Sequence, residues 1–139
     1  DYELDDEERV ISGQGEIVAE YFEKYGFYRD FLEPNEVDWK DHISSKLLPD
    51  SALLVGDTMH IIEKKYQEVS GSVDEKLQTC PFKKQQYEKL LLQIGISVEY
   101  IYVFNDWFRQ ERYADVLDYI EKNNCHYYFN EIPLADIGL

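Results

Sequence analysis

The fold is decided by residues 49–67, which read PDSALLVGDTMHIIEKKYQ. Two apolar runs, 51–55 and 58–67, flank the pair Gly56-Asp57. Apolar runs separated by a two-residue turn that contains glycine are typical of a β-hairpin. We therefore predict two antiparallel strands here, and the rest of the fold is built around them.

This hairpin joins acidic and basic residues that lie apart in the sequence. Asp50 stands at the entrance of the first strand, and twelve residues separate it from Glu63 on the second. Because side chains alternate between the two faces of a strand, Glu63, Lys65 and Gln67 share one face, and Lys64 takes the other. We expect Asp50 and Glu63 to approach each other, with Lys65 one pleat away.

Helical and strand patterns alternate on either side of the hairpin. Gly26 and Gly95 can end two of the helices, and Pro81 interrupts or restarts the second. The expected elements are a helix over 16–25, one over about 75–94 opened by a Ser72–Glu75 capping box, a strand over 98–104, a helix over about 111–122 and a strand over 126–129. This order predicts an α/β fold with helices packed on a mixed β-sheet.

Length and composition indicate one globular domain. The chain has 139 residues, of which 44% are hydrophobic, and this is too apolar for a disordered protein. We expect residues 1–12 to form a loose acidic tail and residues 13–139 to form the domain. No apolar run is long enough to span a bilayer and no signal-peptide pattern opens the chain, so we expect a cytoplasmic protein.

The charge is strongly acidic but unevenly distributed. The formal net charge is −15, which opposes non-specific attraction to nucleic acid. Residues 60–92 are the exception, because they contain six lysines and only five acidic residues. The lysines are Lys64, Lys65, Lys76, Lys83, Lys84 and Lys89.

Two converging carboxylates with a nearby lysine suggest a metal-dependent reaction at phosphorus. Mg²⁺ accepts a couple of carboxylates plus waters and keeps positions open for a phosphate oxygen. Such an ion activates a bound water and neutralises charge at the reacting phosphorus. Lys65 would hold or polarise that water and face the phosphate.

Through Pro49-Asp50 and Glu63-Lys64-Lys65, the sequence resembles the PD-(D/E)XK family of nucleases. Three further stretches resemble its small type II restriction-endonuclease branch: GQGEIVAEYF (13–22), GSVDEKLQTCPFKKQQYEKL (71–90) and VEYIYVFND (98–106). The resemblance covers about residues 13–106 and implies an αβββαβ core. It also implies a Mg²⁺-dependent DNA endonuclease, with Mn²⁺ able to substitute, that leaves a 5′-phosphate and a 3′-hydroxyl.

The family pattern assigns roles to individual residues. Asp50 and Glu63 would be metal ligands together with the main-chain carbonyl of Lys64, and Lys65 would be the catalytic lysine. Gln67 matches a polar residue that often follows the lysine in the family.

Glu16 matches a helix glutamate that reaches the metal through water, with Glu20 as its competitor; the alternative is an ordinary acid in a first helical turn. Lys76, Lys83 and Lys84 would contact DNA phosphates, or would form a solvated helix face.

The substrate would be double-stranded DNA, yet little chain remains to read its sequence beyond 28–48 and the C-terminal tail. We therefore expect a homodimer or a partner subunit that supplies specificity. The alternative function is an acidic inhibitor of a basic nuclease toxin, of the immunity type, in which Asp50 and Glu63 are surface acids and Lys65 belongs to a surface ion pair.

Other candidate sites are weaker. Asp57 lies in the turn of the hairpin and is expected to be a turn residue. The three histidines form no spaced cluster with Cys80 and Cys125, which argues against zinc. His60 falls on the strand face opposite Glu63, which favours a packing role.

Overall fold

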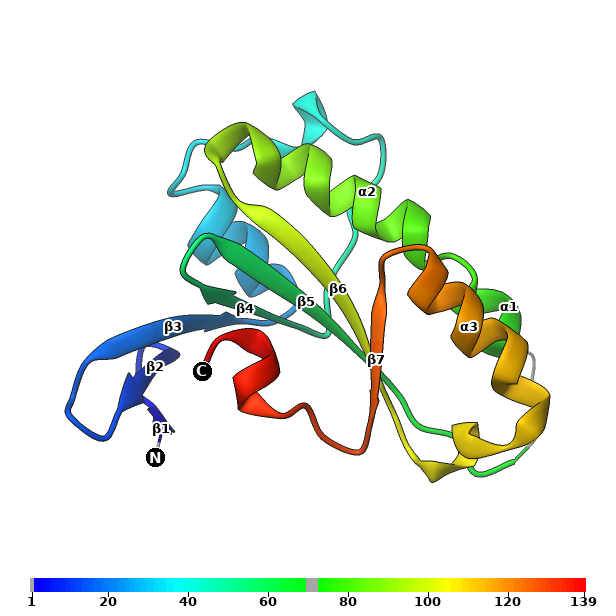
Figure 1. Cartoon of the computed structure of the whole chain (residues 1–139). Coiled ribbons are helices and arrows are strands. Elements are labelled where there is room, and N and C mark those ends of the chain that lie inside the picture. The colour runs from blue at the N-terminus through cyan, green and yellow to red at the C-terminus, as the bar shows by residue number, and fades with distance from the viewer. Residues whose placement is uncertain (1, 70–72) are drawn as a thin grey trace.

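A computed structural model describes residues 2–69 and 73–139 of the chain (Figure 1). Within them, one sheet of seven strands has its strands in chain order, antiparallel from β1 to β5 and parallel from β5 to β7. The strands are β1 (Tyr2–Leu4), β2 (Arg9–Ser12), β3 (Ile17–Phe22), β4 (Ser51–Val55), β5 (Thr58–Lys65), β6 (Ser97–Phe104) and β7 (His126–Phe129). The predicted mixed α/β fold is confirmed.

Helices cover one face of this sheet. The described residues form three α-helices, α1 (Val73–Leu77), α2 (Cys80–Leu91) and α3 (Ala114–Lys122), and a π-helical turn at Phe27–Leu32. None of the described helices is long and apolar enough to cross a membrane. The larger core lies between these helices and the sheet, and Met59, Ile61, Tyr100 and Leu90 are fully buried in it.

A smaller core lies on the opposite face. There the C-terminal segment 130–139 folds back over the strands, as Figure 1 shows in red. Its Ile137 packs with Leu53 of β4 and Ile101 of β6. Met59 and Ile61 of β5 therefore face the helices, and Ile62 faces the C-terminal segment.

The hairpin of β4 and β5 is confirmed. Val55 pairs with Thr58 across Gly56-Asp57, and Ser51 pairs with Ile62 at the other end. Gly56 has φ +59°, a left-handed conformation that glycine adopts without steric cost. The short turn thus fixes the register of the whole hairpin.

The elements after the hairpin also follow the predictions. Pro81 lies in the first turn of α2, where its missing N–H is not needed. Gly95, at φ +78°, ends the helical stretch that follows α2. The strand β6, the helix α3 and the strand β7 occur where periodicity placed them. Ser72 of the expected capping box lies outside the described residues.

The helix predicted over 16–25 is wrong. Residues 17–22 form β3, which pairs with β2 and with β4, and helical backbone begins only at Tyr25. The apolar positions there fit both periods, and β4 would otherwise be an edge with unpaired N–H and C=O groups. The expected αβββαβ order therefore lacks its first helix.

Residues 2–12 of the expected loose tail 1–12 form ordered structure instead. Strands β1 and β2 pair with each other, and β2 pairs with β3. The carboxylate of Asp5 accepts hydrogen bonds from the backbone N–H groups of Glu7 and Arg9, at 2.9 and 2.8 Å, and closes the turn between the strands. Asp5, one of the acids of this segment, thus stabilises a turn.

Candidate active site

The carboxyl groups of Asp50 and Glu63 lie side by side at the end of the β4–β5 hairpin. Ser51 pairs with Ile62, so the next residues outward, Asp50 and Glu63, fall opposite each other. The two carboxyl groups are close enough for each to shift the pKa of the other. The hairpin thus brings together the two acids that the sequence analysis singled out.

Burial gives Glu63 an unusual acidity. Its residue is only 9% exposed, and burial, followed by the hydrogen bond to Asp50 and the charge of Asp50, raises its pKa to about 7. The charges of Lys83 and Lys65 act in the opposite direction. Near neutral pH the Glu63 carboxyl therefore exchanges its proton readily.

Asp50 is held in its ionised form. Burial would raise the pKa of Asp50, but hydrogen bonds from Lys24, Glu63 and the backbone N–H of Lys64 outweigh it and lower the pKa. Without a metal ion, the pair thus keeps one proton on Glu63 and a negative charge on Asp50. Two neighbouring carboxyl groups cannot both ionise cheaply, so the site favours a cation.

Two lysines that the sequence analysis named face Glu63. Lys65 lies two residues beyond Glu63, on the helix-covered face of β5, and is half-buried. Lys83, from the first turn of α2, is half-buried too, and burial lowers its pKa while the charge of Glu63 opposes that shift. Strand β5 and helix α2 therefore bring two ammonium groups toward one carboxyl pair.

A third lysine, Lys24, was missed in the sequence. Its ammonium forms an ion pair with Oδ1 of Asp50, and its backbone N–H donates to the carbonyl of Pro49 at 2.8 Å. The expected helix over 16–25 hid this residue, because its position depends on β3 ending beside β4. No local sequence motif marks it.

The backbone of Lys64 also faces Asp50. Its N–H donates to Oδ2 of Asp50 at 3.0 Å. Within a strand the N–H and C=O of one residue point to the same neighbouring strand, so the Lys64 carbonyl is directed to the Asp50 side of β5. This direction agrees with the main-chain ligand that the family pattern implies.

Glu16 does not belong to the site, which corrects the prediction. Phe22 pairs with Ala52, so the end of β3, and not its beginning, lies beside Asp50. Glu16 precedes Phe22 by six residues, roughly 20 Å along a strand. Its competitor Glu20 pairs with Leu54 and is exposed, so neither glutamate approaches the carboxyl pair.

Three other predicted residues have different surroundings. The side-chain amide of Gln67 donates to the carbonyl of Val69 at 2.6 Å. The side chain of Asn105 accepts from the backbone N–H of Gln67 and donates to its carbonyl. Lys84 donates to the carbonyl of Asn124 at 2.9 Å, and Lys76 is exposed on α1. Of the three lysines predicted to contact phosphates, Lys83 is the one beside the carboxyl pair.

The donor set suits a hard divalent cation. Within residues 2–69 and 73–139 no three His, Cys, Asp or Glu side chains are arranged to hold a metal ion. Mg²⁺, however, commonly takes one or two carboxylates and completes its shell with waters. Asp50, Glu63 and the Lys64 carbonyl meet that requirement.

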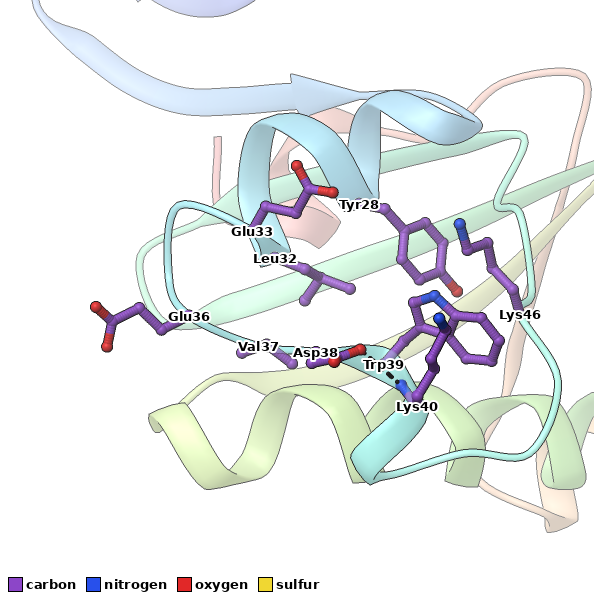
Figure 2. A pocket seen from close by; sticks show the side chains of 9 residues that line it. All are labelled: Tyr28, Leu32, Glu33, Glu36, Val37, Asp38, Trp39, Lys40 and Lys46. Atoms are coloured by element: carbon purple, nitrogen blue, oxygen red, sulfur yellow. Dashed lines mark hydrogen bonds between the residues drawn. The ribbon is translucent and has the colours of Figure 1, made fainter.

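A separate pocket lies beside the chain that leads to Asp50. Figure 2 shows this cavity of about 460 Å³, with Tyr28, Trp39, Lys40 and Lys46 among the residues that line it. The Lys46 ammonium lies 4.8 Å from the centre of the Tyr28 ring and 5.5 Å from that of Trp39.

The Tyr28 hydroxyl donates to the Leu47 carbonyl at 2.5 Å and accepts from the Leu47 N–H at 3.1 Å. Burial raises the pKa of Tyr28 to about 12, so this hydroxyl keeps its proton. Tyr28 thereby anchors the chain three residues before Asp50.

Comparison with protein-family models, curated proteins and solved structures gives no match for this chain.

Proposed function

We propose that the protein is a Mg²⁺-dependent DNA endonuclease of the PD-(D/E)XK type. The observation that carries the proposal is the pair of Asp50 and Glu63, which the hairpin places opposite each other. Lys65 and Lys83 face this pair. A buried carboxyl pair with ammonium groups around it provides for both a cation and a phosphate.

Each residue has a role in phosphodiester hydrolysis. Asp50, Glu63 and the Lys64 carbonyl hold the cation, which supplies charge neutralisation at phosphorus and a more acidic water. Lys65 orients the attacking water and donates to the phosphate. Lys83 compensates the negative charge that builds on the phosphate oxygens. The products are a 5′-phosphate and a 3′-hydroxyl.

Double-stranded DNA is the proposed substrate. The lysines around the carboxyl pair contact its backbone, and phosphate contacts by themselves carry no sequence information. Recognition then needs a second copy of the chain or a partner subunit. A dimer places two such sites on the two strands of a palindromic sequence.

The test is cleavage of plasmid and phage DNA with Mg²⁺ or Mn²⁺. Discrete fragments that disappear with EDTA and in Asp50→Asn are the expected result. Asp57→Asn is the matched control, because it makes the same change in the exposed turn of the same hairpin. Equal cleavage by wild type and Asp50→Asn would contradict the proposal.

Silence in this assay is resolved by calorimetry with Mn²⁺. Mn²⁺ binding that Asp50→Asn abolishes, without cleavage, indicates a cleavage subunit that needs its partner. No cleavage and no Mn²⁺ binding reject the nuclease. The net charge of −15 then favours the alternative, an acidic inhibitor of a basic nuclease toxin.

A further inference from the structure

Lys24 has a backbone conformation that lysine rarely adopts. It lies between the end of β3 and the π-helical turn, with φ +50°. Non-glycine residues in this left-handed region are uncommon and tend to gather at functional sites. Asparagine, aspartate or glycine would fit this conformation with less strain, so the turn alone does not call for a lysine.

The chain holds Lys24 against Asp50 by two contacts. Its backbone N–H donates to the Pro49 carbonyl at 2.8 Å, which ties the end of β3 to the residue just before Asp50. Its ammonium then forms the ion pair with Oδ1 of Asp50. The left-handed turn thus aims a long cationic side chain at the carboxyl pair.

Structural stabilisation does not account for this arrangement. The side chains of Lys24 and Asp50 are 55% and 32% exposed, and exposed ion pairs contribute little to stability. A comparable pair, Lys122 with Asp118 at 2.7 Å, forms within α3 with no unusual backbone. The ion pair between Lys24 and Asp50 therefore contributes little to the stability of the fold.

We propose that Lys24 is a phosphate-binding residue of the nuclease, held on Asp50 until a divalent cation takes that carboxylate. The inference rests on the proposed function and adds a substrate contact to it. Lys24 and a metal ion would compete for the carboxylate of Asp50, because both are cations. Once displaced, the ammonium stays tethered beside Asp50 and binds a non-bridging oxygen of the substrate phosphate.

The ion pair itself supports the exchange. Lys24 is the counter-ion of Asp50 in this structure. A cation that took the Asp50 carboxylate would leave the Lys24 ammonium without this counter-ion and available to a phosphate. Lys24 comes from the β3 side of Asp50 and Lys65 from β5, so the two approach a phosphate from different elements.

The decisive variant is Lys24→Gln in the full chain. It removes the competing ammonium, so Mn²⁺ should bind roughly fivefold more tightly in calorimetry without DNA. It also removes a phosphate contact, so kcat/KM for cleavage of phage DNA should fall by about 10²-fold. The slope of log(kcat/KM) against log salt should flatten by about 0.9. A merely structural role predicts no such opposite changes in metal binding and cleavage.

Three further variants complete the design. Lys24→Arg keeps the charge and should recover most of the cleavage. Lys24→Gly removes the side chain and relieves the backbone strain, so it should behave like Lys24→Gln even if the glutamine variant folds poorly. Lys122→Gln breaks the comparable surface pair and should match wild type in both measurements.

The inference is overturned if Lys24→Gln and Lys24→Gly cleave at the wild-type rate. It is equally overturned if their Mn²⁺ affinity is unchanged or lower. Failure of the proposed function is distinct, because wild type itself then neither binds Mn²⁺ nor cleaves DNA, and that result rejects both.

Discussion

The two faces of β5 each bury an ionisable side chain, and the surroundings of the two differ. Glu63, on the face covered by helices, is 9% exposed, and His60, on the face covered by the C-terminal segment, is 6% exposed. Glu63 meets a second carboxyl group and two lysines. For His60, Nδ1 has no hydrogen-bond partner within the described part of the chain.

Burial favours the neutral form of both Glu63 and His60. It raises the pKa of Glu63 to about 7 and lowers the pKa of His60. The charge of Glu99 raises the His60 pKa and that of His126 lowers it, and these two side chains bind each other at 2.7 Å. A shifted pKa therefore does not by itself mark a site; the convergent second carboxyl and the ammonium groups do.

The largest expected contrast is in cleavage activity. Glu63→Gln removes a proposed metal ligand and should lower the initial rate of plasmid cleavage by about 10³-fold. His60→Gln places the same side chain on the other face of β5 and should leave the rate within about twofold. Both variants are compared at equal Mg²⁺, after circular dichroism has shown that they fold. Equal losses of cleavage rate in the two variants would show that the two faces of β5 do not differ in their role in cleavage.

Stability against pH should separate the faces next. The raised pKa of Glu63 stabilises the fold fully below its ordinary value of 4.5, and this contribution is lost as pH rises through about 7. Glu63→Gln, which cannot ionise, should exceed wild type in free energy of unfolding by an amount that grows between pH 5 and 8. The limit is about 3 kcal/mol, the equivalent of the pKa displacement.

Urea unfolding in EDTA measures this difference. The charged groups that act on Glu63, namely Asp50, Lys65 and Lys83, are the same in both proteins, so the comparison isolates the ionisation of Glu63. A difference that stays constant with pH would show that Glu63 is not protonated in the fold. His60 has the opposite dependence, because burial lowers its pKa.

Two adjacent lysines of α2 give a smaller contrast. Lys83 lies beside Glu63, and Lys84 is bound to the Asn124 carbonyl at 2.9 Å. Lys83→Gln should lower kcat/KM about tenfold, or 1.4 kcal/mol of transition-state stabilisation. Lys84→Gln should leave cleavage unchanged and cost at most about 1 kcal/mol of stability. If Lys84→Gln lowered kcat/KM and Lys83→Gln did not, Lys84 would be the phosphate contact.

The part of the site that the sequence could predict is the part that local pairing determines. A two-residue turn fixes the register of the hairpin, and that register places Asp50 opposite Glu63. The face shared by Glu63 and Lys65 follows from strand alternation alone. Metal coordination and catalysis remain predictions.

The parts that the sequence could not predict depend on distant pairing. Residues 17–22 have apolar positions compatible with helix or strand, and only the free edge of β4 decides between them. Lys24 became visible once that strand was placed, because its contact with Asp50 spans 26 residues. The predicted place of Glu16 near the metal depended on the helix over 16–25. Because this segment is a strand, Glu16 lies far from Asp50.

The smallest expected effect is on His60. Its lowered pKa means that its contribution to stability is complete above its ordinary value of 6.5 and is lost as pH falls through its pKa in the fold. His60→Leu removes a buried Nδ1 without a hydrogen-bond partner in the described residues, so it should gain up to about 1 kcal/mol at pH 8.

That gain should widen toward pH 5, opposite in direction to the effect of Glu63→Gln. Glu99, His126 and Asp136 line the same cavity as His60 in both proteins, so His126→Gln serves as the control for these neighbours. A loss of stability in His60→Leu at every pH would show that the imidazole makes a polar contact that holds this face together. The two faces would then differ only in which charges they gather, and not in whether burial of the ionisable group is unfavourable.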